Sequence, residues 1–277
     1  MGLPSPASST EPVLGSYGDA SVAGIRAEGA STTWLTMRAA SVVGSRHRLA
    51  GEPSDDFFAW SQGDGWAALA VADGLGAIPG SADAAARTCS AAVLAASSCV
   101  LDGSGLDAPA LAAAARLCMQ AAESAARGGG ATTLVLALVA AKGTVSLARV
   151  GDSTAFVVDA QSTRELFPGR EDGTVGTSTA ALPLGENRTD ELGADARTAE
   201  GNVWETASWQ LQPGEVLVLA TDGVADPWRD GPQTVDPALR AAITGQPSPL
   251  SLAGLVDFSR QGCHDDRTVM CAWLRTG

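Results

Sequence analysis

The chain has 277 residues, of which 45% are hydrophobic and 5% aromatic, so it can bury the core of one domain. Its 31 acidic and 18 basic residues give a formal net charge of −13, which argues against nucleic acid as a partner because such a surface repels polyanions. No stretch reaches the ~18 apolar residues of a membrane span, and residues 1–30 lack a secretion signal, so we expect a cytoplasmic protein that does not bind a membrane.

The first half of the chain is predicted to contain strands followed by two helices. Residues 1–31 are rich in Ser, Gly, Ala and Pro without a sustained period, so we expect a flexible or loosely attached segment ahead of a single domain at 32–277. Apolar runs bounded by turn residues predict strands at 33–43, 57–60 and 65–71. Alanine-rich segments then predict helices at 81–101 and 108–127.

The second half of the chain is predicted to contain mostly strands. Aliphatic and β-branched residues predict a hairpin of strands 132–141 and 144–158, and the polar residues 161–201 predict a long surface excursion. Further strands are predicted at 204–211, 216–220 and 268–274, and helices at 237–244 and 250–261. Strands in antiparallel order with helices grouped between them predict an α+β fold with a layered sheet core.

Four aspartate-containing segments lie where an apolar run begins or ends. They are Asp55-Asp56, Asp73-Gly74, Asp222-Gly223 and Asp265-Asp266. Strand ends of a shared sheet can meet at one edge, and Mg²⁺ and Mn²⁺ prefer hard oxygen ligands. A single Asp-Gly is a common turn, but the four segments together predict a two-metal site that can act on a phosphoryl group.

Six short motifs follow one another along the chain. They are Ser54-Asp55-Asp56, Val71-Ala72-Asp73-Gly74-Leu75-Gly76, Gly130-Ala131-Thr132-Thr133-Leu134, Gly151-Asp152-Ser153, Thr221-Asp222-Gly223-Val224-Ala225-Asp226 and Asp265-Asp266-Arg267-Thr268. In this order they resemble the motifs of the metal-dependent protein phosphatases of type 2C. The resemblance implies two antiparallel β-sheets forming a central sandwich flanked by helix pairs. It also implies hydrolysis of phosphoserine or phosphothreonine by attack of metal-activated water at a two-metal centre.

The resemblance assigns ligands to two Mn²⁺ or Mg²⁺ ions. Asp73 would bridge both ions, and the Gly74 carbonyl would bind one of them. Asp222 and Asp265 would complete the shell of one ion. These assignments agree with the oxygen chemistry that the aspartate segments already predict.

Further acidic residues receive weaker assignments from the same resemblance. Asp56, with Asp55 in the preceding acidic position, would hold the other ion through water. Asp152 and Asp226 match positions that bind a third, weaker ion in bacterial members of the family. On their residues alone, Asp152 also fits a bulge in a long strand, and Asp226 fits the start of a turn. Asp266 replaces the family's usual Asn and would orient its neighbouring ligand, face solvent or exchange roles with Asp265.

The phosphate anchor departs from the family pattern. The family has an arginine four residues before the first acidic position, where this chain has Gly51. Segment 44–56 is instead similar to a bacterial subgroup with the signature S-H-x-x-x-G-x-P-x-Q-D. Because a cation beside the scissile phosphate can grip it or protonate the leaving oxygen, Arg46, His47 and Arg48 are the candidate catalytic residues, with His47 the first choice. A solvated basic turn is the alternative.

The leading hypothesis is a serine/threonine protein phosphatase. The resemblance implies a phosphorylated protein as its partner and a kinase that it opposes, and we expect a monomer. Gly51 in place of arginine, and a segment 161–201 without the family's usual flap sequence, favour an alternative: a phosphatase-like module that binds phosphoproteins with weak or no turnover. A third hypothesis is a phosphatase of the same fold that acts on an anti-sigma-factor antagonist.

Overall fold

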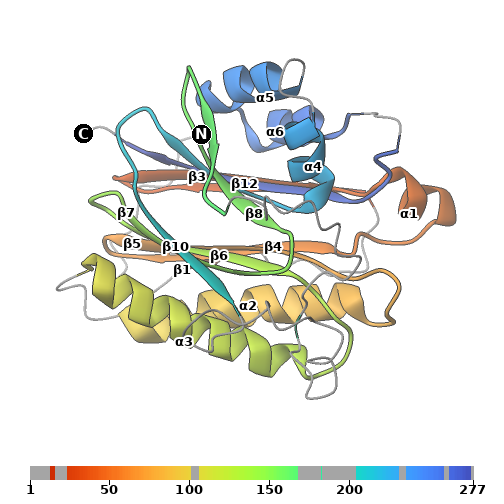
Figure 1. Ribbon diagram of the computed structural model, residues 1–277, viewed down its shortest axis with the longest axis horizontal. Helices are drawn as coiled ribbons and strands as arrows, with labels where there is room; N and C mark the ends of the chain where they lie inside the picture. The colour runs from red at the N-terminus through yellow and green to blue at the C-terminus, as the bar shows by residue number, and fades with distance from the viewer. Residues whose placement is uncertain are drawn as a thin grey trace, which may run out of the picture.

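Two six-stranded antiparallel sheets stack face to face at the centre of the structure, and helices cover their outer faces (Figure 1). The computed structural model describes residues 13–15, 24–100, 106–167, 182, 204–230, 235–258 and 262–275. The arrangement confirms the predicted α+β sandwich flanked by helices. Among the described helices, none is long and apolar enough to cross a membrane.

The first sheet has the strand order β1-β4-β5-β6-β7-β10. Its strands are β1 (Val13–Gly15), β4 (Asp56–Gly63), β5 (Trp66–Asp73), β6 (Leu134–Ala140), β7 (Thr144–Val150) and β10 (Glu205–Gln210). The β4–β5 hairpin places two aspartates side by side, because Asp56 pairs with Asp73 at its open end.

The second sheet has the strand order β2-β3-β12-β11-β8-β9. Its strands are β2 (Ile25–Ser31), β3 (Leu35–Val42), β12 (Arg267–Leu274), β11 (Val216–Ala220), β8 (Thr154–Val158) and β9 (Thr163–Glu165). β11 pairs with β12 on one side and β8 on the other and is buried along its whole length, which agrees with its unbroken apolar sequence.

Helices cover the two outer faces (Figure 1). The first sheet carries α2 (Ser81–Val100) and α3 (Ala108–Ala126), and the second carries α4 (Asp222–Asp230), α5 (Val235–Thr244) and α6 (Pro249–Val256). The alanine-rich sequence of α2 and α3 is explained by this packing, because small side chains such as Ala92 and Ala122 are fully buried where the helices meet the sheet.

The layer between the sheets is a continuous apolar core. Its buried residues come from strands of both sheets and include Phe58, Leu69, Val71, Leu147, Leu217, Leu219 and Met270. Facing side chains of stacked sheets interdigitate across about 10 Å, which fixes the separation of the two layers. The ends of the strands are therefore held in place by the most buried part of the molecule.

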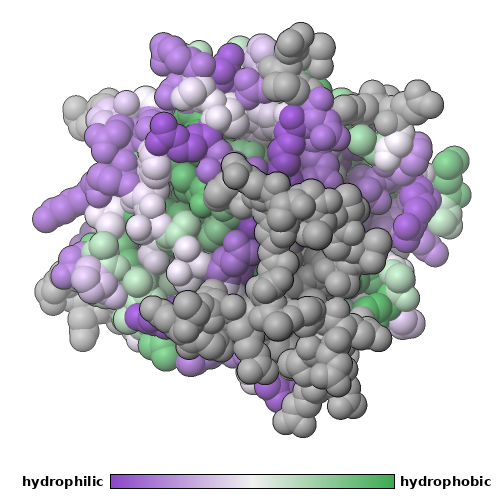
Figure 2. All heavy atoms as spheres, viewed as in Figure 1, coloured by the Kyte–Doolittle hydropathy of each residue, from purple (hydrophilic) through white to green (hydrophobic). Residues whose placement is uncertain are grey.

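A short helix that the sequence analysis did not foresee, α1 (Ser45–Ala50), projects from the edge of the sandwich. It has six residues, none of them fully buried, and ends at Gly51 in the left-handed conformation with a φ of 72°. The face shown in Figure 2 has both hydrophilic and hydrophobic areas where it is described, and a hydrophobic area at its right edge lies over α1, where Leu49 is 90% exposed. The predicted basic turn is thus a helix that a glycine ends.

The predicted strand 144–158 is wrong as a single element. The chain forms β7 and β8, which belong to different sheets, with residues 151–153 between them. Gly151 has a φ of 92°, a conformation that favours glycine, and at this point the chain crosses from one sheet to the other. The strand-bulge interpretation of Asp152 is therefore wrong too, and this residue lies at the crossing.

The interpretation of Asp226 as the start of a turn is wrong, because this residue lies inside α4, which begins at Asp222. Gly223 and Pro227 obscured this helix, since both residues disfavour helix interiors. Packing overrides them: Val224, Ala225 and Trp228 are buried. The helix predicted at 250–261 is also shorter than expected and ends at Val256.

Two further segments differ from expectation. Residues 25–31, predicted to precede the fold, form β2 and pair with β3 along its length. The division into a leading segment 1–31 and a domain 32–277 stays a prediction. Of the excursion 161–201, the structure describes β9 and an isolated bridge from Leu182 to Thr132; residues 168–181 and 183–201 lie outside the described residues.

Candidate metal centre

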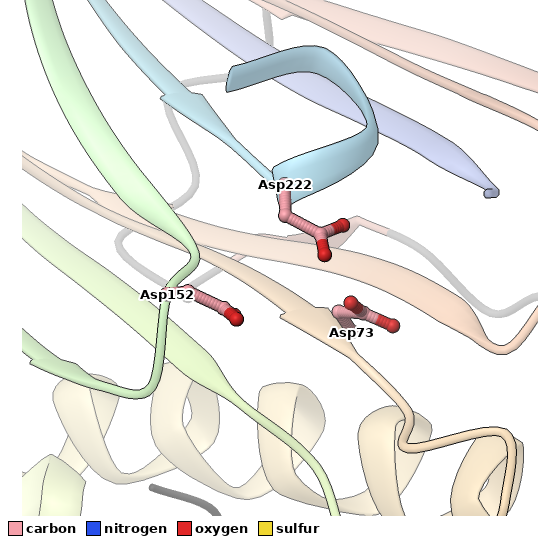
Figure 3. A group of neighbouring side chains, drawn as sticks. All are labelled: Asp73, Asp152 and Asp222. Atoms are coloured by element: carbon pink, nitrogen blue, oxygen red, sulfur yellow. The ribbon is translucent and has the colours of Figure 1, made fainter. Parts of the chain in front are cut away.

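Three aspartates from distant parts of the chain meet at one end of the sandwich (Figure 3). Asp73 ends β5, Asp152 lies at the crossing between β7 and β8, and Asp222 begins α4 after β11. One carboxylate oxygen from each lies within 4.8 Å of the others. Figure 3 shows the three carboxylates directed into a common space. This distance suits a shared divalent cation.

Two threonines of the Gly-Ala-Thr-Thr-Leu motif hold the backbone of Asp73. Thr132 Oγ1 donates a hydrogen bond to the Asp73 carbonyl at 2.8 Å, and the Asp73 amide donates to Thr133 Oγ1 at 3.0 Å. Thr133 Oγ1 also shares a 2.7 Å hydrogen bond with Ser153 Oγ, next to Asp152. The motif therefore holds Asp73 directly and contacts the residue next to Asp152, which gives Ser153 a structural role.

Gly74 is required by its surroundings. A Cβ at this position would lie 2.7 Å from the backbone of Ser81 and 2.8 Å from the carbonyl oxygen of Asp55. The Gly74 amide donates a hydrogen bond to that same Asp55 oxygen at 3.0 Å. Only glycine lets these backbones approach so closely. The role of the Gly74 carbonyl as a ligand stays a prediction.

Asp56 lies opposite Asp73 on the neighbouring strand β4. It is 5% exposed, and its Oδ2 accepts a hydrogen bond from Thr221 Oγ1 at 2.8 Å. Burial, followed by the charge of Asp266, raises the pKa of Asp56 well above its usual range. Because Thr221 precedes Asp222, this hydrogen bond joins the open end of the β4–β5 hairpin to the start of α4.

Burial and mutual repulsion also raise the pKa of the clustered carboxyls. For Asp73 burial is the main cause, followed by the charges of Asp56 and Asp222, and the pKa lies well above its usual range. Burial, together with neighbouring carboxylates of which Asp152 acts most strongly, raises the pKa of Asp222 to about 7. Like charges held this closely favour either protonation or a bound cation.

The residues present fit a divalent metal ion. Asp222 Oδ1 is buried and has no hydrogen-bond partner within the described part of the protein. A buried carboxylate oxygen left in this state is costly unless a cation binds it. An ion among Asp73, Asp152 and Asp222 would provide that partner and neutralise the repelling charges.

The two aspartates before β12 have different environments. Asp265 is exposed, and its charge contributes to the raised pKa of Asp222. Asp266 is 5% exposed and accepts three hydrogen bonds, from the amides of Gly44 at 2.6 Å and Asp55 at 2.7 Å, and from His47 Nδ1 at 2.9 Å. The expectation that Asp266 faces solvent is wrong, and its contact with His47 was not foreseen.

The basic residues of α1 point in different directions, because successive residues of a helix are turned by about 100°. His47 Nε2 lies 3.6 Å from Asp55 Oδ2. A Cβ at Gly76 would lie 3.0 Å from Arg46 Nη2 and 2.8 Å from Asp55 Oδ2, which places Arg46 on the same side. Arg48 instead donates to Asp257 Oδ1 at 3.2 Å and to the Val43 carbonyl at 2.9 Å. The structure does not bring Arg48 to the centre.

A pocket of about 410 Å³ opens beside His47. Asp55, Gly76 and Ser81 also line it, and Ile78 and Pro79 contribute apolar surface. The pocket therefore lies between α1 and the start of α2, next to the centre.

The remaining predicted residue, Asp226, lies outside the group of three. It is on α4 one turn after Asp222, and Arg229 Nη1 donates to its Oδ1 at 2.7 Å. Of the two residues assigned to a third ion, only Asp152 joins the centre in this structure.

Comparisons with known proteins identify the family of this chain. A family model described as protein phosphatase 2C matches residues 43–247, and no curated protein matches. Serine-threonine phosphatase 2C from Toxoplasma gondii is 17% identical, with 92% of this chain and 100% of that chain covered and a TM-score of 0.64.

Two further solved structures contain metal ions. The catalytic domain of the phosphatase PstP, in complex with two manganese ions, is 20% identical, with 88% and 99% of the chains covered and a TM-score of 0.55. RsbX in complex with magnesium is 12% identical, with 90% and 100% covered and a TM-score of 0.56. At these identities the structures show a shared fold, and the family model covers more than half of the sequence. The chain therefore belongs to the protein phosphatase 2C family.

Proposed function

We propose that this protein is a Mn²⁺- or Mg²⁺-dependent phosphatase that hydrolyses phosphoserine or phosphothreonine in proteins. The observation that carries the proposal is the convergence of Asp73, Asp152 and Asp222 within 4.8 Å in a chain of the protein phosphatase 2C family. Its relatives PstP and RsbX bind manganese and magnesium respectively, which supports the choice of ion.

The clustered aspartates would hold the ions. Asp73 and Asp222 would be the central ligands with Asp152 beside them, Asp265 and the Gly74 carbonyl would complete the set, and Asp56 would act through water. When bound, the divalent ions polarise the phosphoryl group and lower the pKa of a bound water. The chain contributes by holding these carboxylates in place, through Thr132 and Thr133 for Asp73 and through Thr221 for Asp56.

His47 and Arg46 would act on the substrate side. Asp266 holds His47 by Nδ1, so Nε2 faces Asp55 and the pocket. From there Nε2 can donate a proton to the leaving serine or threonine oxygen. Arg46 provides the cation that the family places at the position occupied by Gly51 here, and it can grip the phosphate with its guanidinium fork.

The proposal is tested with purified protein, Mn²⁺ and a phosphothreonine peptide, with p-nitrophenyl phosphate as a second substrate. We expect Mn²⁺-dependent turnover that a chelator abolishes. Asp73→Asn should lower the rate by on the order of 100-fold or more, because a metal site contributes several kcal/mol to the transition state.

Asp64→Asn is the matched control. Asp64 is exposed in the turn of the same β4–β5 hairpin, at the opposite end from Asp73. Its substitution should leave the rate unchanged. No turnover of either substrate, or equal rates for Asp73→Asn and the wild type, would contradict the proposal.

One observation favours the alternative of a phosphoprotein-binding module. Gly51 is exposed at the end of α1, so the chain has no arginine at the family's anchor position. Calorimetry separates the two functions: a module without turnover binds the ions and a phosphopeptide but releases no phosphate. Phosphate release under the same conditions would exclude it.

A further inference from the structure

Arg229 occupies a central position among acidic residues beside the metal centre. It lies on α4, the helix that begins with Asp222, and is three residues after Asp226. Its Nη1 donates to Asp226 Oδ1 at 2.7 Å, and its Nε donates to Glu165 Oε2 at 3.0 Å. Nη2 contacts the other oxygen of Glu165. The guanidinium therefore binds two carboxylates with three nitrogens, a geometry that lysine cannot reproduce.

The ion pair is supported from the neighbouring strand. Glu165 is in β9, its side chain is 16% exposed, and its Oε1 also accepts a hydrogen bond from Thr154 Oγ1 at 2.7 Å. The side chain of Arg229 is 31% exposed. Because Glu165 is held by both β8 and Arg229, the guanidinium has little freedom to leave Asp226.

Asp226 is close to the centre without belonging to it. The charge of Asp226 contributes to the raised pKa of Asp222, and the charge of Asp152 contributes to the raised pKa of Asp226. Nevertheless its carboxylate is absent from the group of oxygens within 4.8 Å that Asp73, Asp152 and Asp222 form in the described part of the chain. A cation bound between Asp152 and Asp226 would have to share the Asp226 carboxylate with a tethered guanidinium and lie beside its positive charge.

We propose that Arg229 takes the place of a third metal ion, so that this protein binds two divalent ions and neutralises Asp226 with its own side chain. The inference rests on the proposed function, because it presupposes the two-ion centre. It replaces the third ion that the family resemblance implies at Asp152 and Asp226. The residues fit that ion poorly because the carboxylate of Asp226 is already paired.

The test is a count of bound Mn²⁺ by calorimetry on metal-stripped protein and by native mass spectrometry. Wild type should bind two ions. Arg229→Gln frees Asp226 and should add a third, weaker binding event, which the double variant Arg229→Gln/Asp226→Asn should remove again. Arg127→Gln is the matched control, because it breaks an exposed ion pair with Glu123 on α3, and it should leave the count at two.

Each outcome decides the inference. Three ions in the wild type, or two ions in a folded Arg229→Gln variant, would overturn it. If Arg229→Gln does not fold, Asp226→Asn in the wild type replaces it: unchanged count and affinities support the inference, and a lost or weakened ion refutes it. Absence of any bound Mn²⁺ would overturn the proposed function itself, so the two failures are distinguishable.

Discussion

The two sides of the centre are built from different kinds of structure. On the strand side, Asp73, Asp152 and Asp222 lie at the ends of strands whose residues are buried along nearly their whole length. On the helix side, His47 lies on a six-residue helix without a fully buried residue, held by hydrogen bonds to Asp266 and the loop before β12. The strand side is positioned by the core, whereas the helix side depends on a few polar contacts.

This difference predicts that the geometry of the helix side depends on single polar contacts, such as the hydrogen bond between His47 and Asp266. His47→Ala should lower kcat by about 100-fold or more if Nε2 protonates the leaving oxygen. Asp266→Asn should lower kcat by about 10–100-fold, because a weakened partner leaves the ring poorly oriented. Rates are measured with a phosphothreonine peptide at saturating Mn²⁺.

A double-mutant cycle shows whether Asp266 acts through His47. If it does, His47→Ala/Asp266→Asn is no slower than His47→Ala alone. Additive losses would show that Asp266 supports the metal ligands instead, and the contrast between the two sides would fail.

On the strand side, we expect the repulsion between carboxylates to make the thermal stability of the metal-free protein depend on pH. Asp222 has a pKa of about 7 in the folded metal-free protein, against an ordinary value of 3.8. A carboxyl with a raised pKa favours folding most below its unfolded pKa, and this contribution is lost as the pH rises through about 7. We therefore expect the Tm of the metal-free protein to be several degrees lower at pH 8 than at pH 5.5.

Two controls sharpen this expectation. Mn²⁺ should raise the Tm more at pH 8 than at pH 5.5, because only ionised carboxylates bind it well. Asp222→Asn should flatten the pH dependence, since the amide does not titrate. A Tm that rises between pH 5.5 and pH 8 without metal would contradict the repulsion inferred for the cluster.

The smallest effect is expected at Arg48, which lies on α1 but points away from the pocket. Its exposed pair with Asp257 contributes at most about 1 kcal/mol to stability. Arg48→Gln should leave KM and kcat within about twofold of the wild type, whereas Arg46→Gln should raise KM for a phosphopeptide. Equal increases of KM in both variants would show that α1 acts as a general basic surface.

The same contrast explains what the sequence could predict. The buried strands, the alanine-rich helices and the aspartates at strand ends follow from local patterns, so the positions of Asp73 and Asp222 were foreseen. α4 was missed because its buried face outweighs the local preferences of Gly223 and Pro227. α1 was missed because its signal is one glycine at its end.

Contacts between distant residues were beyond reach of the sequence alone. His47 and Asp266 are separated by 219 residues, and no local pattern indicates that they meet. Likewise Glu165 and Arg229 are brought together only by the pairing of β8 with β9 and β11. One local signal bears on the contact between His47 and Asp266: this chain has aspartate at position 266 where the family has asparagine. A second carboxylate that is buried there requires hydrogen-bond donors from elsewhere in the chain.

The aspartates of the centre come from both sheets, so the apolar core between the sheets influences their spacing. Asp73 belongs to the first sheet and Asp222 follows a strand of the second, so the thickness of the apolar layer sets the distance between these two carboxylates. Leucines such as Leu147 and Leu219 fill this layer and so help to set the separation of the two sheets. We therefore expect the metal affinity of the proposed centre to depend on how well the apolar layer between the sheets is packed.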